Sequence, residues 1–144
     1  MLTKILRGLL IFGSLYFTVD GLIHLFNIKL ISVANSWPKS AISYAILLDS
    51  IFASFIFLAA ALSLLLQANL KKYRTAIFVT AVWAIWHGLL LIFLSFNLDL
   101  VKLSASLPSV HLWLPFYDQY LAFQGSLLLL YAVVALIWFK NEKN

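Results

Sequence analysis

The 144-residue chain contains no cysteine. This absence excludes disulfide bonds, zinc–thiolate centres, iron–sulfur clusters and catalysis by a thiol. Short signatures of other catalytic classes are missing too, because the sequence has no HExxH, GxGxxG, P-loop or GxSxG pattern. Any chemistry must therefore come from polar side chains that lie outside the familiar motifs.

Charged residues are scarce, at 10% of the chain, whereas soluble domains contain roughly 25%. Hydrophobic residues make up 64%, and the mean hydropathy is +1.01. A soluble chain this short has too large a surface to hide so much apolar material. The composition therefore predicts an integral membrane protein. The net charge of +5 does not indicate nucleic-acid binding, because the basic residues fall at segment ends.

Four apolar stretches, at about 5–26, 41–66, 75–96 and 120–139, predict the fold. Each is long enough to cross a hydrocarbon core as a helix, which takes ~20 residues. The runs are continuous and not alternating, as the strands of a barrel would be. We expect an all-α fold: an integral membrane four-helix bundle with four transmembrane helices, forming one transmembrane domain over residues 1–144.

The distribution of Lys and Arg predicts the orientation. With both termini inside, the inner side holds Lys4, Arg7, Lys71, Lys72, Arg74, Lys140 and Lys143, and the outer side holds Lys29, Lys39 and Lys102. The positive-inside rule then favours an N-in, C-in topology. The short KKYR turn predicts that the second and third helices are antiparallel neighbours. Richness in Lys, Asn, Ile and Leu without cysteine favours a prokaryotic plasma (inner) membrane.

The connection at 97–119 is the longest. Its LDLVKLSASL segment is typical of a short amphipathic helix lying in the membrane interface. Pro108 and Pro115 are expected to break the chain there. The aromatic residues that follow fit an interfacial belt. The alternative is a lid over a site between the helices.

Polar residues within the spans are the main functional signal. Asp20, His24, Asp49 and His87 lie inside apolar runs, where a carboxylate costs ~2.5–3.5 kcal/mol on insertion scales. A rise of ~1.5 Å per residue places Asp20, Asp49 and His87 about 8–12 Å below the outer boundary, and Gln124 about 6 Å below it. Each helix thus brings a polar group to the outer half, and these groups are expected to face the bundle interior.

Several chemistries fit this set. Asp20 and His24 are spaced i, i+4 and share one helix face. The Asp/His residues are candidate ligands of a divalent metal. They are equally suited to a proton relay, or to binding the polar end of a lipid-like or amine ligand. The alternative is internal pairing, Asp20 with His24 and Asp49 with His87, as hydrogen bonds between helices.

A haem site is disfavoured by the different depths at which the histidines are expected to lie in the membrane. The two axial ligands of one haem must approach the iron at nearly the same level, whereas His24 and His87 differ by roughly 10 Å in expected depth. His111 lies in the outer connection, where only His24 is within reach.

The leading hypothesis is a small membrane protein with a polar cavity in the outer half that binds a small amphipathic or cationic ligand. Its lining would be Asp20, Asp49 and His87, its rim His24 and Gln124, and its aromatic walls Trp83 and Trp86. One alternative is an accessory or assembly subunit, with a stripe of Ser50, Ala53 and Ser54 facing another membrane protein. A third is a membrane enzyme that uses Asp/His acid–base chemistry on a lipid, although no motif specifies a reaction.

The plan of four spans with acids and histidines in the outer half is similar to that of the small DoxX-like membrane proteins. It is also similar to the group of EXPERA sterol isomerases and the sigma-2 receptor, whose bundles hold an acid-lined ligand cavity. The likeness concerns architecture alone, and no motif of either family matches residue by residue. It therefore implies no site residue in this chain.

Overall fold

The computed structural model describes residues 1–26, 39–97 and 114–142, with all side chains in these ranges except those of 39–41, 44–45 and 114–118. Within these ranges the regular secondary structure is entirely helical. The helices are α1 (Leu2–Leu25), α2 (Lys39–Ala68), α3 (Arg74–Asn97) and α5 (Leu114–Asn141). All four are long and apolar enough to cross a membrane. The predicted all-helical fold with four such helices is confirmed.

One predicted helix boundary is wrong in an informative way. α5 begins at Leu114, so Pro115 lies in its first turn instead of ending a loop. Proline is tolerated there because the first N–H groups of a helix have no partner within the helix. The predicted interfacial helix, His111 and most of the 97–119 connection lie outside the described residues.

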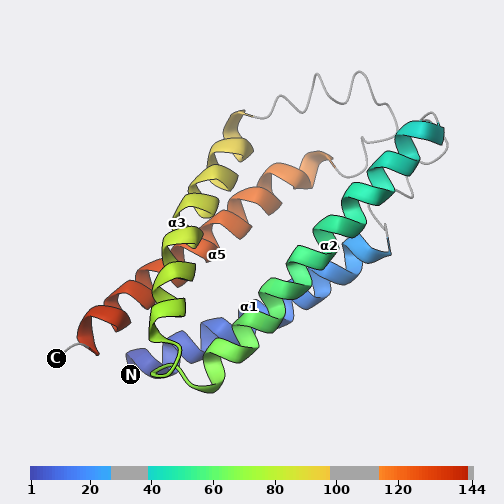
Figure 1. Cartoon of the computed structure of the whole chain (residues 1–144). Helices are drawn as coiled ribbons and strands as arrows, with labels where there is room; N and C mark the ends of the chain where they lie inside the picture. Colours follow the sequence, from blue (N-terminus) through green and yellow to red (C-terminus); the bar gives the residue numbers. More distant parts are fainter. Residues whose placement is uncertain (27–38, 98–113, 143–144) are drawn as a thin grey trace.

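The helices form two antiparallel hairpins. α1 packs along α2, and α3 packs along α5, while the hairpins meet where α1 contacts α5. The spatial order is therefore α2, α1, α5, α3 (Figure 1). The expectation that α2 and α3 are packed neighbours is wrong. The turn at 69–73 joins them, but they diverge from it and do not pack along one another.

The hairpins converge at one end, which we call the basic end; both chain termini and the turn at 69–73 lie there (Figure 1). The buried apolar side chains gather mainly towards this end. They come from the start of α1 and α3 and from the end of α2 and α5, and include Leu6, Leu66, Ile77, Ala135 and Trp138. The opposite end, which we call the far end, is where α2 and α3 stand apart.

α3 and α5 approach most closely at a pair of glycines. A Cβ added to Gly88 would lie 2.9 Å from the carbonyl oxygen of Gly125, and one added to Gly125 would lie 2.7 Å from that of Gly88. Only glycine fits such a backbone contact, as is common between helices in membranes. Small buried residues, Ala81, Ala84 and Ala132, continue this interface. The two helices are thus held in a fixed register.

Candidate functional site

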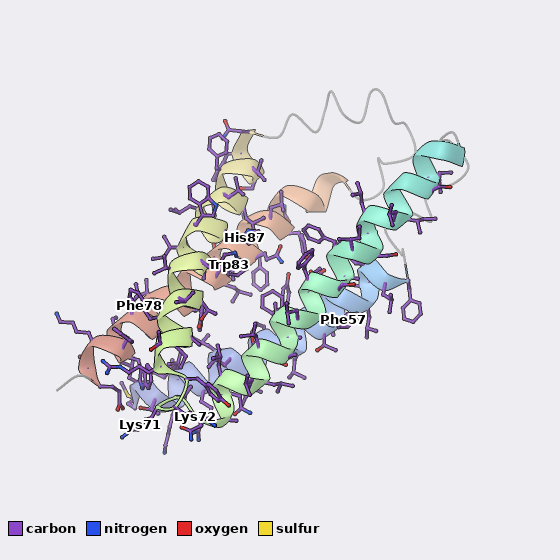
Figure 2. The ribbon with its side chains drawn as sticks, viewed as in Figure 1. Phe57, Lys71, Lys72, Phe78, Trp83 and His87 are labelled. Atoms are coloured by element: carbon purple, nitrogen blue, oxygen red, sulfur yellow. The ribbon has the colours of Figure 1, made fainter. Side chains whose placement is uncertain are left out.

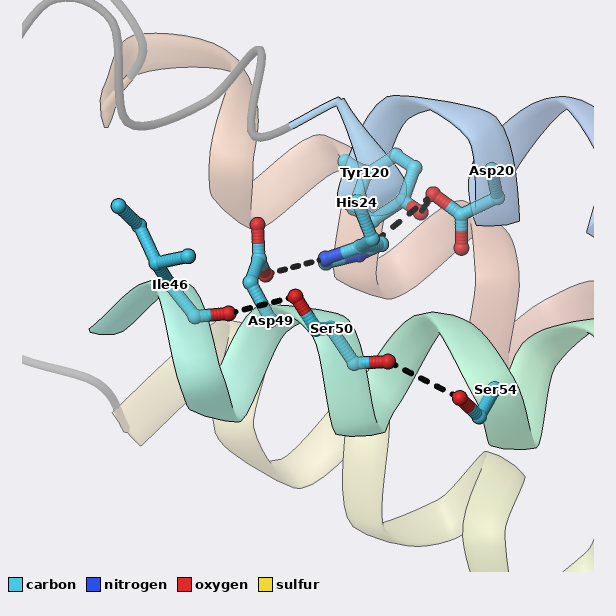
Figure 3. Close-up of polar contacts among 7 residues, drawn as sticks. All are labelled: Asp20, His24, Ile46, Asp49, Ser50, Ser54 and Tyr120. Carbon is cyan, nitrogen blue, oxygen red and sulfur yellow. Dashed lines mark hydrogen bonds and ion pairs between the residues drawn. The ribbon is translucent and has the colours of Figure 1, made fainter. Parts of the chain in front are cut away.

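Four polar side chains form a network at the far end of the helices. The Tyr120 hydroxyl donates to Asp20 Oδ1 over 2.7 Å, and His24 Nδ1 lies 2.5 Å from Asp49 Oδ1 (Figure 3). His24 Nε2 is 3.8 Å from Asp20 Oδ1. We call these four residues the Asp–His network. It links α5 to α1 and α1 to α2, and Asp20 at its centre is only 5% exposed.

The network follows partly from local spacing. Asp20 and His24 are one helical turn apart, so they point to the same side of α1, as predicted. The pairing expected for Asp49 is wrong. Asp49 contacts His24 across the α1–α2 interface, not His87, because α2 packs on α1 and stands away from α3.

A cavity of about 410 Å³ lies between the two hairpins. All four helices contribute to its walls, which are mostly Leu, Ile, Phe and Ala side chains. It exists because α2 and α3 do not close the bundle on that side. Its polar lining residues are Tyr16, Ser63, Thr80, His87, Gln124 and Tyr131.

The Asp–His network borders this cavity without lining it. Asp20 lies one turn beyond the lining residue Tyr16 on α1, and Tyr120 lies one turn beyond Gln124 on α5. Phe52 lines the cavity, and its ring centroid is 5.6 Å from that of His24. The network therefore sits above the far end of the cavity and holds together three of the helices that form it.

His87 and Gln124 are the predicted site residues that do line the cavity. His87 stacks on Trp83, with ring centroids 4.8 Å apart and an angle of 12° between the planes; both are labelled on α3 in Figure 2. Trp83 is also a lining residue. In the described part of the chain, no hydrogen bond joins the His87 or Gln124 side chain to another residue.

The expected role of Trp86 as a second aromatic wall is wrong. Its side chain is 71% exposed and does not line the cavity. Trp86 lies three residues after Trp83, but the face of α3 that meets the cavity is narrow. That face includes Thr80, Ala84 and His87, so Trp86 is turned to the outside of the molecule.

The Asp/His residues are divided between two places. Asp20, His24 and Asp49 meet in the network, and His87 lies in the cavity. Among the described residues, no group of three or more His, Asp or Glu side chains is arranged to hold a metal ion. The network's hydrogen bonds suit another task, which is joining α1 to α2 and to α5.

The site also contains two tyrosines, Tyr120 and Tyr131, which the sequence does not single out as polar site residues. Tyr120 donates to Asp20, and the Tyr131 hydroxyl lies 2.7 Å from Thr80 Oγ1 within the cavity lining. A signal for Tyr131 is present in the sequence, because it follows Gln124 by seven residues and so shares its face of a helix.

Comparison with protein-family models, curated proteins and solved structures finds no match to this chain.

Proposed function

We propose that this chain is inserted in a membrane as a four-span protein with both termini in the cytoplasm, in a prokaryotic plasma membrane as its composition favours. Four helices of sufficient length and apolarity support the insertion. The orientation is supported by the basic end, where Lys71 and Lys72 lie beside the chain termini (Figures 1 and 2). In this setting the cavity lies within the bilayer.

The proposed function is to bind one amphipathic ligand in the cavity between the hairpins. The observation that carries this proposal is the placement of His87 and Gln124. Both face an apolar cavity and form no hydrogen bond within the described residues. Polar groups left unsatisfied in a membrane are costly. A ligand whose polar end binds these two side chains, and whose apolar body fills the rest, would satisfy them.

The cavity wall favours a ligand that is dissolved in the bilayer. Phe55 and Leu58 of α2 line the cavity and are also 66% and 57% exposed, and Trp83 of α3 is 49% exposed. The cavity thus reaches the outer surface between α2 and α3, where lipid would surround the protein. Volumes of this size are typical of small-molecule sites, which span ~300–1,000 Å³.

The polar end of the ligand is expected to be uncharged. The cationic alternative needs a carboxylate in the lining, and both carboxylates of the site lie in the Asp–His network instead. The lining offers imidazole, amide and hydroxyl groups, which donate and accept hydrogen bonds without requiring a charge.

Native mass spectrometry of the gently extracted protein tests the proposal. We expect a bound species of a few hundred daltons, which is lost when Ala59→Phe fills the cavity. Ala61→Phe is the matched control, because Ala61 is an exposed alanine two positions away on α2 and does not line the cavity. An unliganded wild-type protein, or equal occupancy in the two variants, contradicts the proposal.

A second candidate is an accessory subunit of a membrane complex. Ser54 is exposed on α2, and its hydroxyl donates to the carbonyl of Ser50, while Ser50 donates to that of Ile46 (Figure 3). Such small side chains on an outer face allow another helix to pack closely. Ala53 of the same predicted stripe faces inward and is buried. A stoichiometric protein complex in the same mass spectra would favour this function.

A further inference from the structure

We infer that the ligand carries two hydrogen-bonding groups, one near each end of an apolar framework, and that the inner one is a hydroxyl bound by Tyr131. The inference rests on the proposed function, because it concerns the same cavity. It goes further in naming a second polar position and the chemistry that this position accepts.

Two polar positions lie on the same wall of the cavity. His87 and Gln124 form the outer position, and Thr80 and Tyr131 form the inner one; all four line the cavity. His87 follows Thr80 by seven residues on α3, and Tyr131 follows Gln124 by seven on α5. Seven residues of helix correspond to ~10.5 Å. Because α3 and α5 are antiparallel, the inner and outer positions are separated by this same distance along both helices.

Two separate contacts between α3 and α5 fix the heights of the inner and outer positions along the helix axes. The hydrogen bond between Thr80 and Tyr131 places these residues at one level. The close backbone contact between Gly88 and Gly125 places their immediate neighbours, His87 and Gln124, at a second level. The spacing of the two positions therefore follows from the register of α3 and α5, and side-chain movement changes it little.

The hydroxyl groups at the inner position favour a hydroxyl on the ligand. Thr80 Oγ1 lies 3.0 Å from the carbonyl of Ile77, to which it can donate, and 2.7 Å from the Tyr131 hydroxyl, where either group can be the donor. If Tyr131 donates to Thr80, its oxygen offers lone pairs to the cavity. If Thr80 donates to Tyr131, the tyrosine keeps its proton for the cavity. A ligand hydroxyl can both donate and accept, so it fits either arrangement without a charge and suits a membrane-soluble molecule.

The wall between the two positions is apolar. Ala84 and Leu128 lie between them on α3 and α5, with Leu127 beside Leu128. A ligand that reaches both positions must therefore present hydrocarbon over most of the distance. The cavity discriminates against a simple fatty chain with one polar end, because such a chain forms a hydrogen bond at only one of the two positions.

Competition between two probes tests this inference in the full-length protein in detergent. The reporter is a dansyl-labelled fatty alcohol, excited by energy transfer from the chain's tryptophans, and the competitors are 1-octanol and 1,8-octanediol. We expect Tyr131→Phe to weaken displacement by the diol about three- to tenfold, as for the loss of one neutral hydrogen bond. Displacement by octanol should change less than about twofold. Each competitor is compared between wild type and variant, so its partition into detergent is the same in both measurements and cancels.

The controls separate the two proposals. Tyr73→Phe removes a tyrosine hydroxyl outside the cavity lining and should alter neither competitor. Gln124→Leu removes part of the outer position and should reduce the preference for the diol as Tyr131→Phe does. If Tyr131→Phe affects diol and octanol equally, while Ala59→Phe still abolishes reporter binding, the two-group inference is overturned and the proposed function stands. If the reporter binds Ala59→Phe as well as wild type, both fail.

Discussion

His24 lies between two carboxylates, one on its own helix and one on α2. Its Nδ1 is 2.5 Å from Asp49, and its Nε2 is 3.8 Å from Asp20. Removing one partner of a hydrogen-bonded pair that is largely shielded from water is more costly than replacing both, because the remaining polar group is left without a partner. The Asp–His network should therefore act mainly on stability, since it joins α1 to its neighbours and lies outside the cavity lining.

We predict that His24→Leu lowers the free energy of unfolding by about 3 kcal/mol. The double variant His24→Leu/Asp49→Leu should recover part of that loss, because it removes the carboxylate that the single variant leaves unpaired. Unfolding followed by helix content in increasing SDS measures both. Equal stability of wild type and His24→Leu would show that the network does not join the helices.

Local spacing could predict half of this network. The spacing of one helical turn between Asp20 and His24 places both on the same face of α1. The cost of a carboxylate in an apolar run predicts that the Asp20 side chain points to the interior of the bundle. The partner of Asp49 could not be predicted in this way. It depends on which helix α2 packs against, and that depends on side-chain fit along the whole of α1 and α2.

Helix pairs in this molecule are set by small residues. The Gly88–Gly125 contact brings α3 and α5 together, and Gly21 leaves room for the ring of Phe57 between α1 and α2. A Cβ on Gly21 would lie 2.9 Å from that ring. The helices themselves could be predicted from length and hydropathy. Their pairing could not, because membrane helices are apolar on nearly every face and the short turn at 69–73 only suggests that α2 and α3 are neighbours.

We predict that Gly125→Ala destabilises the protein by about 1–3 kcal/mol, because the new methyl group would overlap the Gly88 carbonyl. Gly8→Ala is the matched control. Beyond the backbone of its own helix and its chain neighbours, no atom lies within 4 Å of a Cβ built there. The change should therefore be neutral or stabilising by up to ~1 kcal/mol through helix propensity. The same SDS unfolding experiment compares them, and equal effects would contradict the close α3–α5 contact.

The molecule as a whole has one basic end and one end where α2 and α3 stand apart. Its asymmetry of charge was evident from the sequence, because the Lys and Arg residues cluster at the segment ends. The cavity was expected from polar residues that converge in depth. Its true cause is different: the hairpins α1–α2 and α3–α5 meet only through α1 and α5, which leaves the opposite side unfilled.

Absence of cysteine allows a direct test of the orientation. We predict that Lys72→Cys reacts with a membrane-impermeant maleimide only in inside-out vesicles, because the proposed orientation places the exposed turn at the basic end in the cytoplasm. Phe26→Cys, an exposed position at the far end of α1, should react only in right-side-out vesicles. The reverse pattern would show that the topology is inverted. Labelling of both positions from one side would contradict a spanning α2, which is the helix between them.

The arrangement into two sequential hairpins also bears on how the protein is made. Each hairpin consists of helices that follow one another among those the structure describes, so its contacts can form as soon as its second helix has emerged. The α1–α2 hairpin is complete before α5 has been synthesised. The cavity exists only after the second hairpin docks through α1 and α5. A ligand present during biogenesis would therefore favour this last assembly step, by binding the docked state and neither hairpin alone.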